Sequence, residues 1–139
     1  MAYPVKEAMR KHVVTIDEDA STVEAAKLMS EGRSGCVIVL RAGKPVGIVT
    51  ENNLTLKVIS KGLEPDKVKI KDVMTSRIIS VDPDVDLYEA VRLMTRHNIR
   101  RLPVIRDDVL YGILGPRELA HHFSSYADRR IVSAISRRD

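Results

Sequence analysis

The sequence predicts an α/β (α+β) protein in which two pseudo-symmetric half-domains pack into one module. First, the stretch from Val5 to Leu54 aligns without a gap with residues 70–119, a shift of 65 positions (70 − 5). Second, short β-branched runs alternate with helical patterns in the same order in both copies. Third, 139 residues suffice for one compact core but not for two independent domains of ordinary size. Two copies are too few for a solenoid, so we expect the halves to bury their apolar faces against each other.

The repeat is carried by identical residues as well as by like-for-like exchanges. Thirteen of the fifty aligned positions are identical. In the first copy these are Lys6, Met9, Asp17, Asp19, Glu24, Ala25, Leu28, Met29, Val39, Arg41, Gly47, Ile48 and Leu54. We therefore place the first half at residues 5–62, the second at 70–123, and a C-terminal basic helix or tail at 124–139.

Each half opens with a short helical turn, predicted at residues 5–9 and 70–74 from apolar residues spaced three and four apart. The β-branched runs Val13–Ile16 and Ile78–Val81 then predict short strands that end in acidic turns. We expect each half to continue as helix, strand, strand and helix.

The helix after each acidic turn has the spacing of a capping box. Ser21 with Glu24, and Asp86 with Glu89, place an oxygen acceptor three residues before a Glu. The sequence therefore predicts a helix that starts at each of these positions.

A hairpin follows each helix. The apolar runs Cys36–Leu40 and Val46–Val49 predict the first hairpin, and Leu102–Ile105 and Tyr111–Leu114 predict the second. Pro103 cannot donate a hydrogen bond to a ladder, so we expect its strand to begin at an edge or a bulge.

A closing helix completes each half. In the first half it is predicted from about residue 52 to residue 60 and is stopped by Gly62. Its counterpart in the second half starts at Arg117 and runs into the final segment. Each strand-to-helix junction is therefore a turn that begins a helix.

Composition bounds the class of protein. Hydrophobic residues make up 44% and charged residues 30% of the chain, which is typical of a folded globular protein. No apolar run approaches the roughly 20 residues that span a bilayer, and the start lacks a signal peptide's apolar core, so we expect a cytoplasmic protein without membrane contact. Cys36 lies in an apolar run and is predicted to be a small buried thiol. The formal charge of +4 permits nucleic-acid or acidic partners.

The turn from Gly47 to Leu54 and its counterpart at 112–119 have the features of a ligand site. A glycine lets a ligand approach the backbone, and Thr and Asn at a helix start suit a polyhydroxylated, anionic ligand. A plain strand-to-helix connection with an N-cap is the alternative interpretation of this turn.

Taken together, these features resemble a tandem pair of cystathionine-β-synthase (CBS) domains, also called a Bateman module. The likeness rests on the openings at 5–9 and 70–75, the strand-turn-helix at 13–29 and its echo, the run Arg101–Ile105, and the endings at 47–50 and 112–114. The resemblance implies a non-enzymatic, free-standing regulatory module that binds AMP, ADP, ATP or S-adenosylmethionine. It also implies a homodimer and an unidentified regulated partner protein.

The family pattern Gly-h-h-[Thr/Ser]-x-x-Asp, where h is an apolar residue, can be carried over position by position. It places Thr50 at the phosphate-side hydroxyl and puts Asn53 where the family has a ribose-binding carboxylate. In the second half Gly115 lacks the hydroxyl and Glu118 replaces the Asp on a longer arm. The basic residues before Leu-Pro resemble phosphate contacts of the family, so we expect one asymmetric site rather than two equal ones.

The full predicted ligand-binding set also contains apolar strand residues of both clefts, which are expected to contact adenine. It further contains Thr15 and Ser80, whose backbone is expected to lie beside the base. Core packing is the alternative role for the apolar members. The set is Thr15, Ile16, Gly35, Cys36, Val37, Val46, Gly47, Ile48, Thr50, Asn52, Asn53, Ser80, Val81, Arg100, Arg101, Leu102, Pro103, Gly112, Ile113, Arg117 and Glu118.

The primary functional hypothesis is an adenine-nucleotide sensor that acts through a partner protein. No catalytic arrangement, catalytic cofactor or metal spacing is predicted. One alternative is a basic nucleic-acid-binding protein that uses the arginine pairs at 100–101, 129–130 and 137–138. Another is a CBS scaffold whose incomplete sites no longer bind nucleotide.

Overall fold

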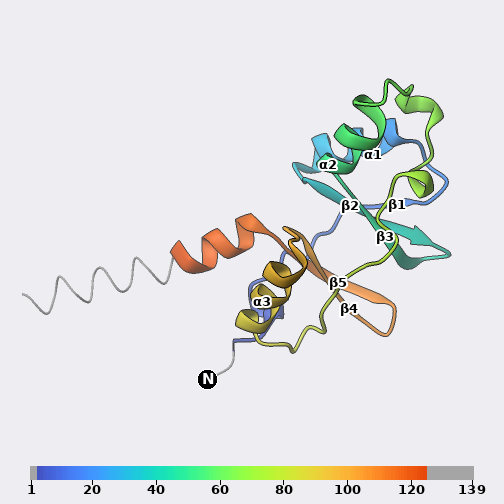
Figure 1. The fold of residues 1–139 in the computed structure, drawn as a ribbon. Helices are drawn as coiled ribbons and strands as arrows, with labels where there is room; N and C mark the ends of the chain where they lie inside the picture. Colours follow the sequence, from blue (N-terminus) through green and yellow to red (C-terminus); the bar gives the residue numbers. More distant parts are fainter. Residues whose placement is uncertain (1–2, 125–139) are drawn as a thin grey trace, which may run out of the picture.

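The computed structural model of the chain describes residues 3–124 and confirms the predicted α/β fold class (Figure 1). The predicted C-terminal helix or tail falls, from residue 125 on, outside the described residues. In chain order the elements are η1 (Val5–Glu7), β1 (Thr15–Asp17), α1 (Thr22–Gly32), β2 (Cys36–Arg41), β3 (Lys44–Thr50), α2 (Glu51–Leu54), η2 (Thr55–Ile59), η3 (Pro65–Lys67), η4 (Ile70–Asp72), α3 (Leu87–His97), β4 (Leu102–Arg106), β5 (Val109–Leu114) and a helix at 116–124.

The first half contains a three-stranded sheet in which β2 lies between β1 and β3. β1 pairs with β2 in parallel, and β2 pairs with β3 as an antiparallel hairpin. The hairpin turns at Ala42 and Gly43, both at positive φ, which suits a tight turn between twisted strands. The second hairpin, β4–β5, repeats this geometry with positive φ at Asp107 and Asp108, so both predicted hairpins are confirmed.

The predicted strand at Ile78–Val81 is wrong, because only Val81 forms an isolated parallel bridge with Val104. Its counterpart in the first half is a strand in which the Ile38 N–H donates to the Val14 carbonyl at 2.9 Å. The residue equivalent to Ile38 is Pro103, which has no N–H to donate. Pro103 is the second residue of β4, an edge strand of the two-stranded sheet, which agrees with the expectation from its missing N–H. A second ladder bond is also absent, because Pro83 has no N–H where its counterpart, Glu18, donates to a strand carbonyl, and a single bridge remains.

The two predicted capping boxes differ in outcome. Ser21 is the N-cap of α1, and its hydroxyl accepts a hydrogen bond from the Glu24 N–H at 3.2 Å. Asp86 is the N-cap of α3 but makes no side-chain cap. Its carboxylate instead accepts the N–H of Tyr3 at 3.0 Å, because the first residues of the chain run alongside the start of α3 (Figure 1).

The halves exchange their opening segments. Val5 is fully buried in the core of the second half, and its N–H donates to the Val85 carbonyl at 2.8 Å. Ile70 is fully buried in the core of the first half, and its N–H donates to the Ala20 carbonyl at 2.8 Å. Each half therefore completes its core with a segment that precedes the other half in sequence.

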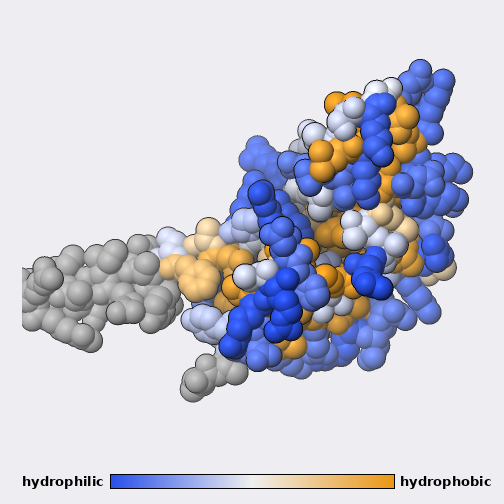
Figure 2. Space-filling view, in the orientation of Figure 1, coloured by the Kyte–Doolittle hydropathy of each residue, from blue (hydrophilic) through white to orange (hydrophobic). Residues whose placement is uncertain are grey.

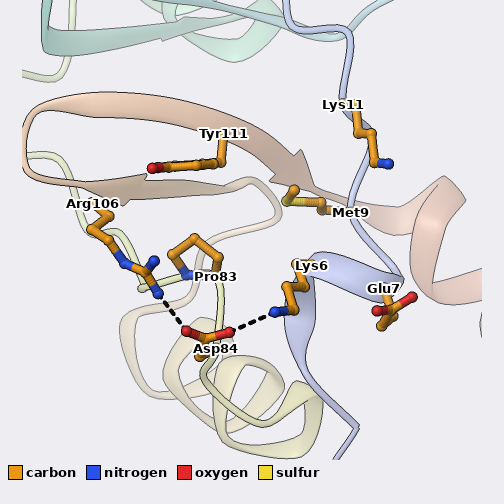
Figure 3. A pocket seen from close by; sticks show the side chains of 8 residues that line it. All are labelled: Lys6, Glu7, Met9, Lys11, Pro83, Asp84, Arg106 and Tyr111. Carbon is orange, nitrogen blue, oxygen red and sulfur yellow. Dashed lines mark hydrogen bonds and ion pairs between the residues drawn. The ribbon is translucent and has the colours of Figure 1, made fainter.

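Ion pairs also join the opening segment of each half to the acidic turn of the other half. They explain why a lysine and an aspartate recur at the same places in both copies. Lys6 pairs with Asp84 at 2.8 Å, and Lys71 pairs with Asp19 at 3.1 Å. Arg106 joins the first pair through Asp84, as Figure 3 shows, and forks onto Asp82 at 2.7 and 2.8 Å. The hydrogen bonds from Arg106 lower the pKa of Asp82 from 3.8 to about 2.

The closing helix of the first half begins at Glu51, close to the predicted start, and continues from α2 into the π-helical turn η2. Its counterpart occupies residues 116–124, and the Leu119 N–H donates to the Gly115 carbonyl at 3.1 Å. Within residues 3–124 no helix is both long and apolar enough to cross a bilayer.

Candidate functional site

A cleft of about 1090 Å³ lies where the two halves meet. At one wall the backbones of the two halves pair directly. The Ile48 N–H donates to the Thr75 carbonyl at 3.0 Å, and the Thr75 N–H donates to the Ile48 carbonyl at 2.9 Å. The first half contributes the end of β3 and the start of α2, and the second contributes residues 75–79 and the segment from α3 to β4. Both halves therefore line the cleft, and its volume is slightly above the roughly 300–1,000 Å³ that is typical of small-molecule sites.

Several predicted ligand-binding residues line this cleft. They are Gly35, Ile48, Thr50, Asn52, Asn53, Arg100, Arg101 and Pro103. The structure thus brings the hydroxyl-bearing turn of the first half together with the two arginines of the second. Their contact with a ligand stays a prediction.

The other predicted residues lie outside the lining of this cleft. Ile16, Val37 and Leu102 belong to the hydrophobic cores, which is the alternative role considered for the apolar set. The complete group is Thr15, Ile16, Cys36, Val37, Val46, Gly47, Ser80, Val81, Leu102, Gly112, Ile113, Arg117 and Glu118.

Two of these, the strand glycines, are explained by packing between segments. A Cβ on Gly47 would come 2.5 Å from the Met74 sulfur and 3.1 Å from the Thr75 carbonyl oxygen. A Cβ on Gly112 would come 2.7 Å from the Arg10 carbonyl oxygen. Each glycine therefore makes room for the opening segment that crosses its strand.

Sequence reasoning missed most of the lining that residues 75–79, α3 with the two residues that follow it, and the two closing helices supply. These residues are Glu51, Thr55, Thr75, Arg77, Ile78, Ile79, Val91, Met94, Thr95, Asn98, Ile99, Pro116 and Leu119. Arg77, a lone charge directly before an apolar run, was the available signal. The α3 residues carried none, because their apolar spacing is equally that of a core face.

Thr50 and Asn53 form a reciprocal capping box at the start of α2. The Thr50 hydroxyl accepts the Asn53 N–H at 3.2 Å, and the Asn53 side-chain oxygen accepts the Thr50 N–H at 2.9 Å. The same oxygen also accepts the Thr50 hydroxyl proton at 3.1 Å. The Asn53 oxygen is therefore occupied by the cap, and the amide NH₂ remains the group that can bond a ligand.

Three guanidinium groups line the cleft. Among the described residues, Arg77, Arg100 and Arg101 make no side-chain hydrogen bond and no ion pair within 4.0 Å. Glu51 is the acidic residue in the same lining. The lining has an excess of positive charge with free donors, which suits phosphate oxygens.

The backbone at Ile79 offers a hydrogen-bond acceptor to the cleft. Its counterpart, the Val14 carbonyl, accepts the Ile38 N–H, but Pro103 faces Ile79 without a donor. Within residues 3–124 no hydrogen bond reaches the Ile79 carbonyl. Both Ile79 and Pro103 line the cleft, so this acceptor is available to a ligand that carries an N–H group.

Cys36 is 3% exposed and does not line the cleft. Burial raises the pKa of its thiol, and the nearby Arg101 only partly opposes the shift. A thiol held neutral in this way is a structural side chain rather than a nucleophile.

The fold and this cleft define a module of two CBS domains. A family model described as the CBS domain matches residues 5–60 and 70–125, and the chain belongs to that family, as the resemblance implied. Proteins of this family are generally regulatory modules that bind adenine nucleotides.

Individual relatives extend over most of the chain. It is 38% identical over 117 residues to an uncharacterized protein of Methanopyrus kandleri, covering 83% of this chain but only 60% of that relative's length. It is 31% identical over 116 residues to the CBS domain-containing protein YhcV of Bacillus subtilis, covering 84% of this chain and 82% of YhcV. The crystal structure of an uncharacterized conserved protein from Pyrococcus horikoshii superposes with a TM-score of 0.82 at 28% identity, covering 88% and 92% of the two chains.

Proposed function

We propose that this chain is a regulatory module that binds one adenine nucleotide in the cleft between its halves and signals to a partner protein. The observation that carries the proposal is the convergence of Thr50, Asn53 and three unpaired arginines on a cleft whose wall also contains a free backbone carbonyl. Asn53 suits the ribose, Thr50 and the arginines suit the phosphates, and the carbonyl suits the base of an adenine nucleotide.

The free Ile79 carbonyl favours adenine over guanine. The exocyclic group at position 6 is an N–H donor in adenine and a carbonyl acceptor in guanine. A donor satisfies the Ile79 oxygen, whereas an acceptor would face it and leave both unpaired, a cost of about 1–3 kcal/mol. The apolar side chains of Ile48, Ile78 and Pro103 provide surfaces against which a base can pack.

The arginines favour ligands with phosphate over S-adenosylmethionine. Guanidinium groups bind phosphate oxygens through two parallel charge-assisted bonds. The sulfonium of S-adenosylmethionine is a cation and would be repelled by Arg77, Arg100 and Arg101, which line the cleft with it. We therefore rank AMP, ADP and ATP above S-adenosylmethionine.

A ligand in this cleft would act by population shift. Ile48 and Thr75 belong to different halves and line the cleft together. A nucleotide that contacts both walls stabilises the arrangement in which the walls are correctly spaced, and a partner that binds that arrangement better responds to the ligand.

The surface on which a partner or a second copy would dock is the exposed apolar side of the first half's closing helix. Leu56 and Ile59 are 54% and 64% exposed. Figure 2 shows hydrophobic side chains at the surface over this upper part of the molecule, among largely hydrophilic neighbours. A homodimer through this side is part of the proposal.

The proposal is tested by calorimetric titration of the full chain with ATP, AMP, adenosine, S-adenosylmethionine and GTP. We expect saturable binding of ATP or AMP, at least about tenfold weaker binding of GTP, and a stability gain of about 2.7 kcal/mol at 100 times the dissociation constant. Absence of binding by every nucleoside ligand would refute the sensor and favour the scaffold. Binding of an oligonucleotide that weakens steeply with salt and is insensitive to ATP would favour the nucleic-acid alternative.

A further inference from the structure

The pseudo-symmetry of the chain defines a second cleft position, related to the first by the 65-residue shift. Thr50, Asn53, Ile79 and Pro103 of the first cleft correspond there to Gly115, Glu118, Val14 and Ile38. Whether both positions bind ligand depends on how these groups are occupied within the protein itself.

Arg101 occupies the space that a hydroxyl would need in the second position. Arg101 directly precedes Leu102 and Gly115 directly follows Leu114, and these two leucines form the end register pair of the second hairpin. The residues equivalent to Arg101 and Gly115 in the first hairpin are Cys36 and Thr50, where a small thiol leaves room for the Thr50 side chain. A Cβ on Gly115 would lie 2.8 Å from the Arg101 Nη1 atom, closer than real Cβ contacts allow.

The guanidinium is held there from the other side as well. A Cβ on Gly35 would overlap the Arg101 Nη2 atom, so the side chain reaches from the start of β4 to the segment before β2. The Glu118 carboxylate lies near the same point, 3.2 Å from the position of the Gly115 Cβ. Gly35 and Gly115 thus form a two-sided slot for one arginine.

Glycine at position 115 has no other local explanation. Gly115 caps the helix at 116–124 through its carbonyl, and it is not among the glycines with positive φ. At such an N-cap, Ser or Thr is ordinarily at least as stabilising as Gly, and the first half uses Thr50. A side chain at this position would have to displace the Arg101 guanidinium, so glycine is the residue that lets the guanidinium stay there.

The base position of the second cleft is also occupied. The Val14 carbonyl accepts the Ile38 N–H at 2.9 Å, whereas the corresponding Ile79 carbonyl is free. The second position therefore lacks both the hydroxyl and the backbone acceptor.

We propose that the chain binds a single nucleotide, because Arg101 fills the hydroxyl position of the second site while it serves the first. This inference rests on the proposed nucleotide function. Gly115 and Gly35 are then positioning residues that keep the guanidinium at the first cleft.

A double-mutant cycle in thermal unfolding tests the slot without any ligand. Gly115→Ser should lower the melting temperature by about 2–4 °C in the wild-type chain, because the Arg101 guanidinium has to move aside. In an Arg101→Ala background the same change should be neutral or stabilising, because Ser is a good N-cap. Arg100→Ala, which removes the neighbouring arginine, is the matched control and should leave the cost of Gly115→Ser unchanged. Equal costs of Gly115→Ser in all three backgrounds would overturn the assignment.

Calorimetric stoichiometry tests the single site. We expect one AMP per chain in the wild type, and at least a threefold loss of AMP affinity in Gly115→Ser through displacement of Arg101. Two AMP molecules per chain would overturn the proposal even if the nucleotide function is correct. No AMP binding at all would refute the nucleotide function, and the thermal cycle alone would then decide whether Arg101 fills the slot.

Discussion

Replacing Asn53 by Asp restores the carboxylate that the family pattern carries at this position, and the structure indicates how much should be gained. The Asn53 oxygen already accepts two bonds from Thr50, at 2.9 and 3.1 Å, and an Asp can keep both with one oxygen. Its second oxygen then replaces the amide NH₂ that is available to the cleft. A charge-assisted bond contributes about 1 kcal/mol more than a neutral one, so a ribose diol should bind roughly fivefold more tightly.

The assay is titration of Asn53→Asp with adenosine and with 2′-deoxyadenosine. The gain should appear for adenosine and shrink to less than twofold for the deoxy compound, which lacks half of the diol. Asn52→Asp is the matched control, since it adds the same charge one position away in the same lining. Equal effects of the two variants, or an equal gain for both nucleosides, would refute the assignment of Asn53 to the ribose and move the ligand toward Glu118.

Three further predictions concern charge, acid and thiol chemistry. Arg77→Ala should weaken ATP about fivefold, through loss of an exposed charge-assisted contact worth roughly 1 kcal/mol, and should change adenosine affinity less than twofold in the same titration. The folded pKa of Asp82 is about 2, below its ordinary 3.8, so its contribution to stability is present above pH 4 and is lost as pH falls toward 2. Arg106→Gln should therefore flatten the melting temperature against pH over that window. Cys36, which is 3% exposed with a raised thiol pKa, should react with iodoacetamide only after unfolding in urea.

Each of these has a contradicting outcome. Arg96→Ala removes an exposed arginine of α3 that does not line the cleft, and an equal loss of ATP affinity there would mean that only net charge matters. Melting curves of wild type and Arg106→Gln that stay parallel from pH 5 to pH 2 would refute the role of Arg106 in lowering the pKa of Asp82. Labelling of Cys36 within minutes in native buffer would contradict its burial.

Local sequence chemistry predicted most of the elements. Both hairpins, the cap at Ser21 and the closing helices follow from patterns within about ten residues. The strand at Ile78–Val81 failed because two prolines cannot donate its ladder bonds: Pro83, shortly after the run, and Pro103 on the neighbouring strand. Asp86 failed as a cap because a segment 83 residues away took its carboxylate.

The candidate site was predicted in part for the same reason. Thr50 and Asn53 could be located by motif, as could Arg100 and Arg101, because they occupy fixed places in the repeat. The contribution of Arg77 and of the end of α3 could not be located by motif, because these residues reach the cleft only when the second half packs against β3. Strand residues such as Val37 and Leu102 were assigned to the ligand although their side chains fill the cores.

The sequence by itself determined the family, the two-fold repeat and the order of elements, because these are written in residue identity and short-range spacing. Only the tertiary structure decided how the halves interlock, with Val5 completing one core and Ile70 the other. It also decided that Arg101 lies in the slot between Gly35 and Gly115, and that the Ile79 carbonyl is left free. The physical reason is that packing, steric exclusion and hydrogen-bond competition act between segments that are distant in the chain, and so leave no local signal in either segment alone.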